Sequence, residues 1–161
     1  MLSYEFLDHL ADAYNPVLAA AWLLLVGHAL VFRRWRAALA RVALGLGALL
    51  VAYGGMWLDD ALGVWPSMGL DYSTHAAVAL ALCAALWVLA RRSRIVVAVS
   101  LAAYCLLMVY QRYHTPADIA STLLVVAVPM AGVVWCLAPS TGFGRRVADK
   151  SLQPKPPRGA G

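Results

Sequence analysis

The stretch HTPADIASTLLVVAVPMAGVVWCLA, residues 114–138, is typical of a membrane-spanning helix, and its sequence also indicates where that helix begins. Proline is favoured at the first position of a helix, so Pro116 makes Thr115 the N-cap and Asp118 the third helical residue. The apolar run that follows has the length of roughly 17–25 residues that a helix needs to cross a bilayer. A threonine cap with an acid three residues later is a variant capping box, which gives Asp118 a structural interpretation.

The remainder of the chain has the same apolar character. Hydrophobic residues make up 63% of the 161 residues and charged residues 13%, which excludes an ordinary soluble domain. We expect an all-α membrane helix bundle of about five transmembrane helices, over residues 16–138. The predicted spans are 16–32, 37–58, 74–90, 95–110 and 116–138. The third and fourth of them lie at or just below the short end of the required length.

Two segments are expected outside this bundle. Residues 1–15 place apolar side chains at helical spacing beside acidic ones, which predicts an amphipathic helix on the membrane interface. Residues 139–161 are rich in proline and in basic residues, which predicts a disordered, basic cytoplasmic tail.

The basic residues gather around the first-to-second connection, in the third-to-fourth connection and in the tail. By the positive-inside rule these three regions are cytoplasmic, so the N-terminus and the loops 59–73 and 111–115 face outward. Arg112 is the one basic residue predicted on the outer face. We expect a bacterial inner-membrane protein with a periplasmic N-terminus, a cytoplasmic C-terminus and any site on the periplasmic side.

Two histidines stand at helix starts on the predicted outer face. His114 precedes the last span, and His75 lies in the first turn of the third span, behind Ser73 as N-cap and Thr74. Free N–H groups at a helix start bind anions, and a hydroxyl and an imidazole there would complete a phosphate site. The alternative is that these are ordinary polar residues at a membrane interface. Because lipid disfavours unpaired polar side chains, two histidines at helix starts on one face indicate a functional site.

Asp118 and Arg112 extend this candidate site. From the third helical position the Asp118 carboxylate can reach back to His114 and fix its tautomer, leaving the other ring nitrogen as nucleophile or base. Arg112 offers a guanidinium of the kind that binds phosphate oxygens, with a snorkelling interface arginine as the alternative. Three loop acids are expected to be solvated and not to bind a metal: Asp59, Asp60 and Asp71.

Two short patterns resemble the motifs of the type 2 phosphatidic acid phosphatase superfamily, whose fold is shared with vanadium haloperoxidases. Ser73 and His75 match the second motif of that family, Pro-Ser-Gly-His. His114 and Asp118 match the end of the third motif, His-x-x-x-Asp. The resemblance covers residues 56–125, with the family's helix count between the two motifs.

The chain departs from the family pattern at its basic positions. It lacks the first basic motif, Lys-x6-Arg-Pro, because Leu58 and Trp65 occupy the two basic positions. The third motif carries an arginine six residues before its histidine, and Met108 stands there. Arg112 lies one helical turn later and is the candidate substitute. The usual member of the family also has six spans.

The resemblance implies a phosphoryl transfer in two steps that needs no metal and no cofactor. His114 would attack phosphorus and form a phosphohistidine, and Asp118 would orient the imidazole. His75 would protonate the leaving group and then activate water. The residues expected to hold the phosphoryl group are Ser73, Thr74 and Arg112.

We therefore expect an integral-membrane lipid phosphatase that hydrolyses a phosphate ester or a diphosphate lipid at the outer face. Its partners would be the lipid phosphate substrate and membrane lipids, and not nucleic acid. Two alternatives stay open. One is a phospho-headgroup transferase that resembles sphingomyelin and inositol-phosphoceramide synthases, and the other is a catalytically silent relative that binds lipids.

Overall fold

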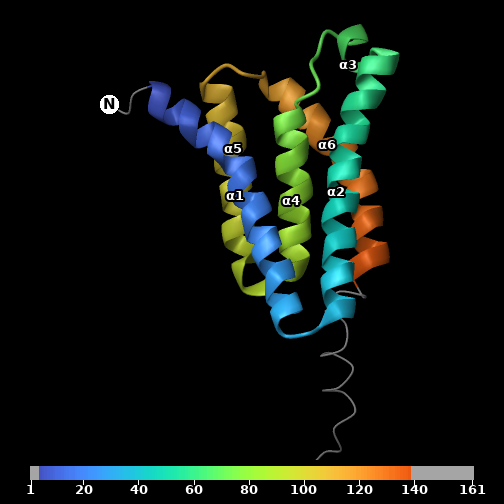
Figure 1. The fold of residues 1–161 in the computed structure, drawn as a ribbon. Helices are drawn as coiled ribbons and strands as arrows, with labels where there is room; N and C mark the ends of the chain where they lie inside the picture. Colours follow the sequence, from blue (N-terminus) through green and yellow to red (C-terminus); the bar gives the residue numbers. More distant parts are fainter. Residues whose placement is uncertain (1–3, 139–161) are drawn as a thin grey trace, which may run out of the picture.

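A computed structural model describes residues 4–138, and within that range the chain is helical and contains no strand. The expected all-α class is therefore confirmed. The helices are α1 (Tyr4–Val31), α2 (Trp35–Leu62), α3 (Val64–Ser67), α4 (Thr74–Leu89), η1 (Arg91–Ser93), α5 (Arg94–Tyr110) and α6 (Pro116–Leu137). Figure 1 shows the five longer helices side by side, with α3 beyond the end of α2.

The helix lengths are those of a membrane protein. Among residues 4–138, four helical segments are long and apolar enough to cross a membrane: α1, α2, α6, and α5 together with η1. The third predicted span, α4, has 16 residues and falls short of the length that spans a bilayer. The structure thus supports four of the five expected spans by length, and the remaining one, α4, is a shorter apolar helix.

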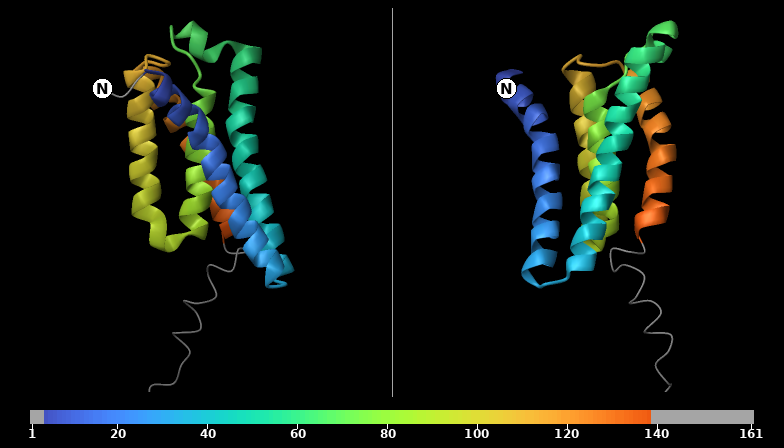
Figure 2. Two further views of the ribbon diagram at one scale, coloured as in Figure 1. Left: turned by 60° about the vertical axis from the view of Figure 1, so that its left-hand side comes forward. Right: turned by 45° about the vertical axis from the view of Figure 1, so that its right-hand side comes forward.

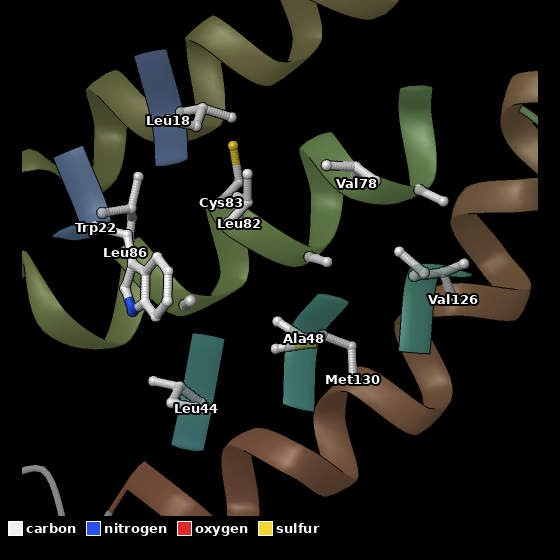
Figure 3. Close-up of a cluster of buried hydrophobic side chains, with 14 of the residues drawn as sticks. Leu18, Trp22, Leu44, Ala48, Val78, Leu82, Cys83, Leu86, Val126 and Met130 are labelled. Carbon is white, nitrogen blue, oxygen red and sulfur yellow. The ribbon is translucent and has the colours of Figure 1, made fainter. Parts of the chain in front are cut away.

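The short helix α4 lies at the centre of the bundle. It packs against α1, α2, α5 and α6, and most of its side chains are buried. Many of them are alanines, which let the neighbouring helices approach closely where lipid supplies no hydrophobic driving force. Figure 3 shows this core, in which α4 contacts side chains of α1, α2 and α6. The labelled members of the core cluster are Leu18, Trp22, Leu44, Ala48, Val78, Leu82, Cys83, Leu86, Val126 and Met130.

The start of the chain differs from the expectation. Residues 4–15 are continuous with the first span in the single helix α1, which contains Pro16. The predicted boundary after residue 15 is therefore not a break between two helices. Proline removes one backbone hydrogen bond and bends a helix without ending it when neighbours support the chain. The first turns of α1 lean away from α2 (Figure 2).

The two ends of the bundle differ in chemistry. The connection that carries Arg33 and Arg34 and the connection that carries Arg91 and Arg92 lie at one end, which we call the arginine end (Figure 1). The starts of α4 and α6 lie at the opposite end, which we call the histidine end. The predicted basic tail, 139–161, lies outside the described residues.

Candidate functional site

The start of α4 is held by a serine, as its sequence predicts. The Ser73 hydroxyl accepts a hydrogen bond from the Ala76 N–H at 3.3 Å and is the N-cap of the helix. Its own N–H donates to the Thr122 hydroxyl on α6 at 3.1 Å. Ser73 is completely buried and lines neither hollow described below. In this structure Ser73 positions the helix start, and its contact with a phosphate stays a prediction.

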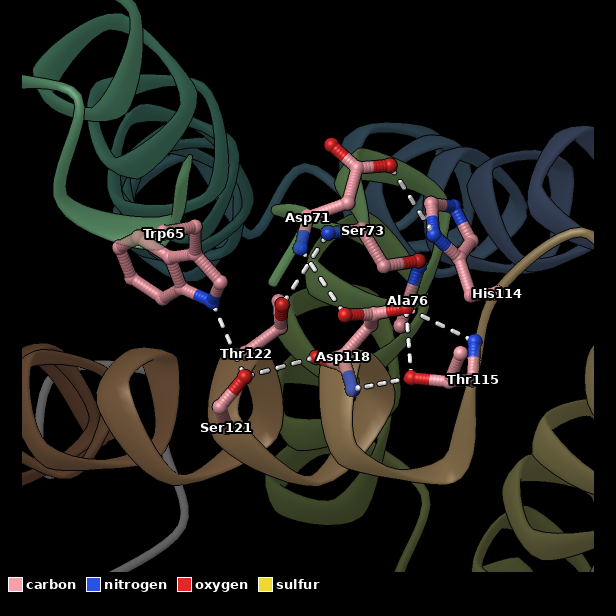
Figure 4. Close-up of polar contacts among 9 residues, drawn as sticks. All are labelled: Trp65, Asp71, Ser73, Ala76, His114, Thr115, Asp118, Ser121 and Thr122. Carbon is pink, nitrogen blue, oxygen red and sulfur yellow. Dashed lines mark hydrogen bonds and ion pairs between the residues drawn. The ribbon is translucent and has the colours of Figure 1, made fainter. Parts of the chain in front are cut away.

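The start of α6 is a complete capping box around a carboxylate. The Thr115 hydroxyl accepts from the Asp118 N–H, while Asp118 Oδ2 accepts from the Thr115 N–H at 2.8 Å and from its hydroxyl at 2.7 Å. The other oxygen, Oδ1, accepts from the Asp71 N–H at 2.9 Å. Figure 4 shows these contacts. The buried Asp118 carboxylate therefore ties the start of α6 to the loop before α4.

The carboxylate beside His114 belongs to a different residue from the expected one. His114 Nδ1 lies 3.3 Å from Asp71 Oδ2, an ion-pair separation, although the two atoms are not aligned for a hydrogen bond (Figure 4). The His114 side chain is 14% exposed and that of Asp71 is 72% exposed. Because the hydrogen bonds of Asp118 are directed to Thr115 and Asp71, the expectation that Asp118 orients the imidazole is wrong for this geometry.

A cavity of about 200 Å³ brings the two histidines together at the histidine end. Its lining residues are Ala11, Asp12, His75, Tyr104, Met108, Tyr113 and His114. Helix α1 forms one wall and is fastened to α4, because the Asn15 side-chain amide donates to the His75 carbonyl at 3.2 Å. The spatial convergence that the two separate patterns predicted is therefore present.

A second hollow, of about 490 Å³, adjoins the first and shares Tyr113 and His114 with it. It is lined by Asp71, Tyr113 and Asp118 and also by Arg112, the predicted phosphate ligand. Arg112 is exposed, its backbone is in the left-handed region at φ 60°, and its guanidinium has no hydrogen bond or ion pair within residues 4–138. Its cation is therefore available to a ligand in this hollow.

The loop between α2 and α4 is anchored by buried polar contacts. Asp59 is buried and its carboxylate accepts from the Trp65 N–H at 2.8 Å, so the expectation of a solvated acid is wrong there. The Trp65 indole donates to Ser121 on α6 at 3.0 Å. Tyr72 donates to the Ala52 carbonyl at 2.7 Å, and burial, with Asp59 nearby, raises the pKa of Tyr72 to about 12. The phenol therefore stays a donor at neutral pH.

Three residues of this end were not predicted as part of the site. Thr122 follows Asp118 by one helical turn, so its position on the same face was a usable signal. Asp71 stands two residues before the cap of α4, and the only signal in the sequence that it could belong to the site is that it carries a carboxylate. Asp12 reaches the cavity because α1 packs on α4, which no local pattern reveals.

Among residues 4–138, no three or more His, Cys, Asp or Glu side chains gather closely enough to hold a metal ion. No protein-family model matches the chain, and no curated protein or solved structure is significantly similar to it. The resemblance to phosphatidic acid phosphatases stays a prediction from the positions of His75, His114 and Asp118.

Proposed function

We propose that this chain is an integral-membrane lipid phosphatase that hydrolyses a phosphate ester or diphosphate lipid through a phosphohistidine. The observation that carries the proposal is the shared cavity of about 200 Å³, which His75 and His114 enter from separate helix starts. Two imidazoles that line one cavity can act on the same phosphate ester, one as the nucleophile at phosphorus and the other as the general acid that protonates the leaving oxygen.

The proposed reaction has two steps. The His114 Nδ1 atom faces Asp71, so the other nitrogen, Nε2, is the one that attacks phosphorus. The bond from phosphorus to the leaving oxygen breaks, and His75 donates a proton to that oxygen. Water then attacks the phosphohistidine, His75 accepts the proton of that water, and the P–N bond breaks to release phosphate. Asp71 stabilises the positive charge of the His114 ring during both steps.

The phosphoryl oxygens need cations and donors, because negative charge spreads over them in the transition state. Arg112 is the available guanidinium in the hollow beside His114. Thr74 lies in the first turn of α4, next to His75, but it lines neither hollow, so its hydroxyl would have to turn toward His75 to contact a phosphoryl oxygen. Ser73 acts behind them as the cap of that turn.

The proposed orientation follows from the charges. The arginine end of the bundle is cytoplasmic by the positive-inside rule, so the histidine end opens on the outer face. In a bacterial inner membrane this face is periplasmic, and the substrate is a lipid whose phosphate lies in the outer leaflet.

The test measures phosphate release by the full chain in detergent with EDTA, from phosphatidic acid, phosphatidylglycerol phosphate and undecaprenyl pyrophosphate. The variants are His114→Ala and, as a matched control, His28→Ala near the arginine end of α1. We expect release by the wild type and by the control, and none by His114→Ala. Unchanged release by His114→Ala, or no release from any substrate, would overturn the proposal.

A second readout follows the covalent intermediate. Protein quenched during turnover of a labelled lipid phosphate should carry an acid-labile, alkali-stable label, because phosphohistidine has that stability. The label should be absent from His114→Ala, and in His75→Ala it should both form and disappear more slowly, because His75 serves in both steps. Transfer of the label to an added lipid alcohol, without free phosphate, would favour the transferase alternative.

A further inference from the structure

An apolar groove lies between α5 and α6. Helix α5 packs mainly against α4 and α1, and α6 packs mainly against α4 and α2, so α5 and α6 have little direct contact with each other. The space between them is a hollow of about 580 Å³ with apolar side chains on both walls. Its lining includes Ala102, Cys105, Leu106, Ile119, Ala120 and Leu123.

This hollow adjoins the candidate site at one end and a hollow between α4, α5 and α6 at the other. It shares Val109 and Pro116 with the hollow beside His114. It shares Ala98 and Leu101 with a deeper apolar hollow of about 360 Å³ between α4, α5 and α6. We call the three hollows together the α5–α6 groove.

The groove changes from polar to apolar along its length. At the histidine end it presents Arg112, His114 and the buried Asp118. Beyond Pro116, most of the wall is formed by aliphatic side chains and alanines. A site with an available cation at one end and an apolar channel behind it matches an amphiphile with an anionic headgroup.

The length of the groove matches a lipid chain. Its wall on α6 runs from Pro116 to Val134, which at 1.5 Å per residue is about 27 Å along the helix. One leaflet of a bilayer is about 15 Å of hydrocarbon, half the thickness of the whole core. The groove therefore accommodates a complete chain of one leaflet and continues past the middle of the membrane.

We propose that the α5–α6 groove binds one hydrocarbon chain of the phosphate lipid whose headgroup occupies the site at Arg112 and His114. The proposal rests on the lipid phosphatase function proposed above. A chain gains no hydrophobic free energy by leaving the bilayer for the groove, since both surroundings are apolar. Its effect is to hold the lipid so that the phosphate stays beside His114, which is a gain in positioning.

The test uses phosphatidic acid with a diazirine in the middle of one acyl chain, in nanodiscs of phosphatidylcholine, with the full chain. Ala120→Phe fills the groove near the site. Ala103→Phe is the matched control, because Ala103 is exposed on α5 and does not line the groove. Ala98→Leu narrows the junction of the two deeper hollows and serves as a second, milder variant.

We expect photolabel on the walls of the groove in α5 and α6, reduced about tenfold by Ala120→Phe and unchanged by Ala103→Phe. Excess unlabelled phosphatidic acid should compete with the label and phosphatidylcholine should not, and Arg112→Gln should remove that difference. In Ala98→Leu the label should be lost from the deeper part of the groove only.

Label spread evenly over the lipid-facing sides of α1 and α2, or unaffected by Ala120→Phe, would overturn the proposal. So would a cross-linked dimer with its contacts in the groove, because a second copy would then be the occupant. Photolabelling needs no turnover, so labelling of the groove without any phosphate release would support lipid binding in the groove and reject the phosphatase function. Phosphate release without such labelling would reject the groove alone.

Discussion

Asp71 and Asp118 make different contacts, and exchanging each for asparagine should separate stability from catalysis. The Asp118 carboxylate is buried and accepts three hydrogen bonds, two at Oδ2 from Thr115 and one at Oδ1 from the Asp71 N–H. Asparagine keeps a single acceptor oxygen, so the Thr115 N–H or the Asp71 N–H loses its partner. Hydrogen bonds to charged groups contribute about 1.5–3 kcal/mol each, so Asp118→Asn should lower the free energy of unfolding by about 3 kcal/mol.

Asp71→Asn should lower the rate of catalysis and leave the stability nearly unchanged. The Asp71 side chain is 72% exposed, and its carboxylate pairs with His114 at 3.3 Å. In solvent with a dielectric constant of about 80, two unit charges at that distance attract by about 1.3 kcal/mol, a factor of about ten in rate. We expect kcat to fall about tenfold, with the free energy of unfolding changed by less than about 1 kcal/mol.

The assay pairs unfolding by sodium dodecyl sulfate titration in mixed micelles with phosphate release per folded molecule. Asp71→Glu is the rescue variant, since it restores the negative charge, and it should recover part of the lost kcat. The reasoning would be refuted if Asp118→Asn unfolded like the wild type but lost activity while Asp71→Asn kept full activity. Asp118 would then be the carboxylate that acts on His114.

Three further predictions concern packing, capping and metal independence. A Cβ at Gly55 would lie 2.5 Å from the Tyr72 hydroxyl, so Gly55→Val should lower stability by about 1–3 kcal/mol. Gly54→Ala has open space and should not, and equal midpoints of the two variants in the sodium dodecyl sulfate titration would contradict this. Thr122→Val leaves the buried Ser73 N–H without its acceptor and should cost about 1–3 kcal/mol in the same titration, and an unchanged midpoint would count against the capping role of this contact. EDTA should leave phosphate release unchanged, because histidine carries the phosphoryl group; a loss that Mg²⁺ restores would reject that mechanism.

Local features of the sequence predicted much of what the structure contains. The length of the apolar runs indicated the helices, because a hydrocarbon core requires that length. Ser73 and Thr115 were predicted as caps and are caps, since an N-cap is a contact within one turn of chain. The capping interpretation of Asp118 is confirmed for the same reason. Placing His75 and His114 at two helix starts on one face was enough to bring them to the same end.

The sequence by itself therefore determined an all-helical, membrane-type bundle, the starts of its helices and the end at which two histidines meet. Tertiary structure decided that α4 is the buried centre of the bundle and that α1 continues through Pro16 to form a wall of the cavity. It also decided that Asp71, and not Asp118, faces His114. The physical reason is the distance along the chain between the groups that interact. Helix caps depend on residues within one turn and spans depend on the bilayer, whereas contacts between loops depend on how helices distant in the chain pack.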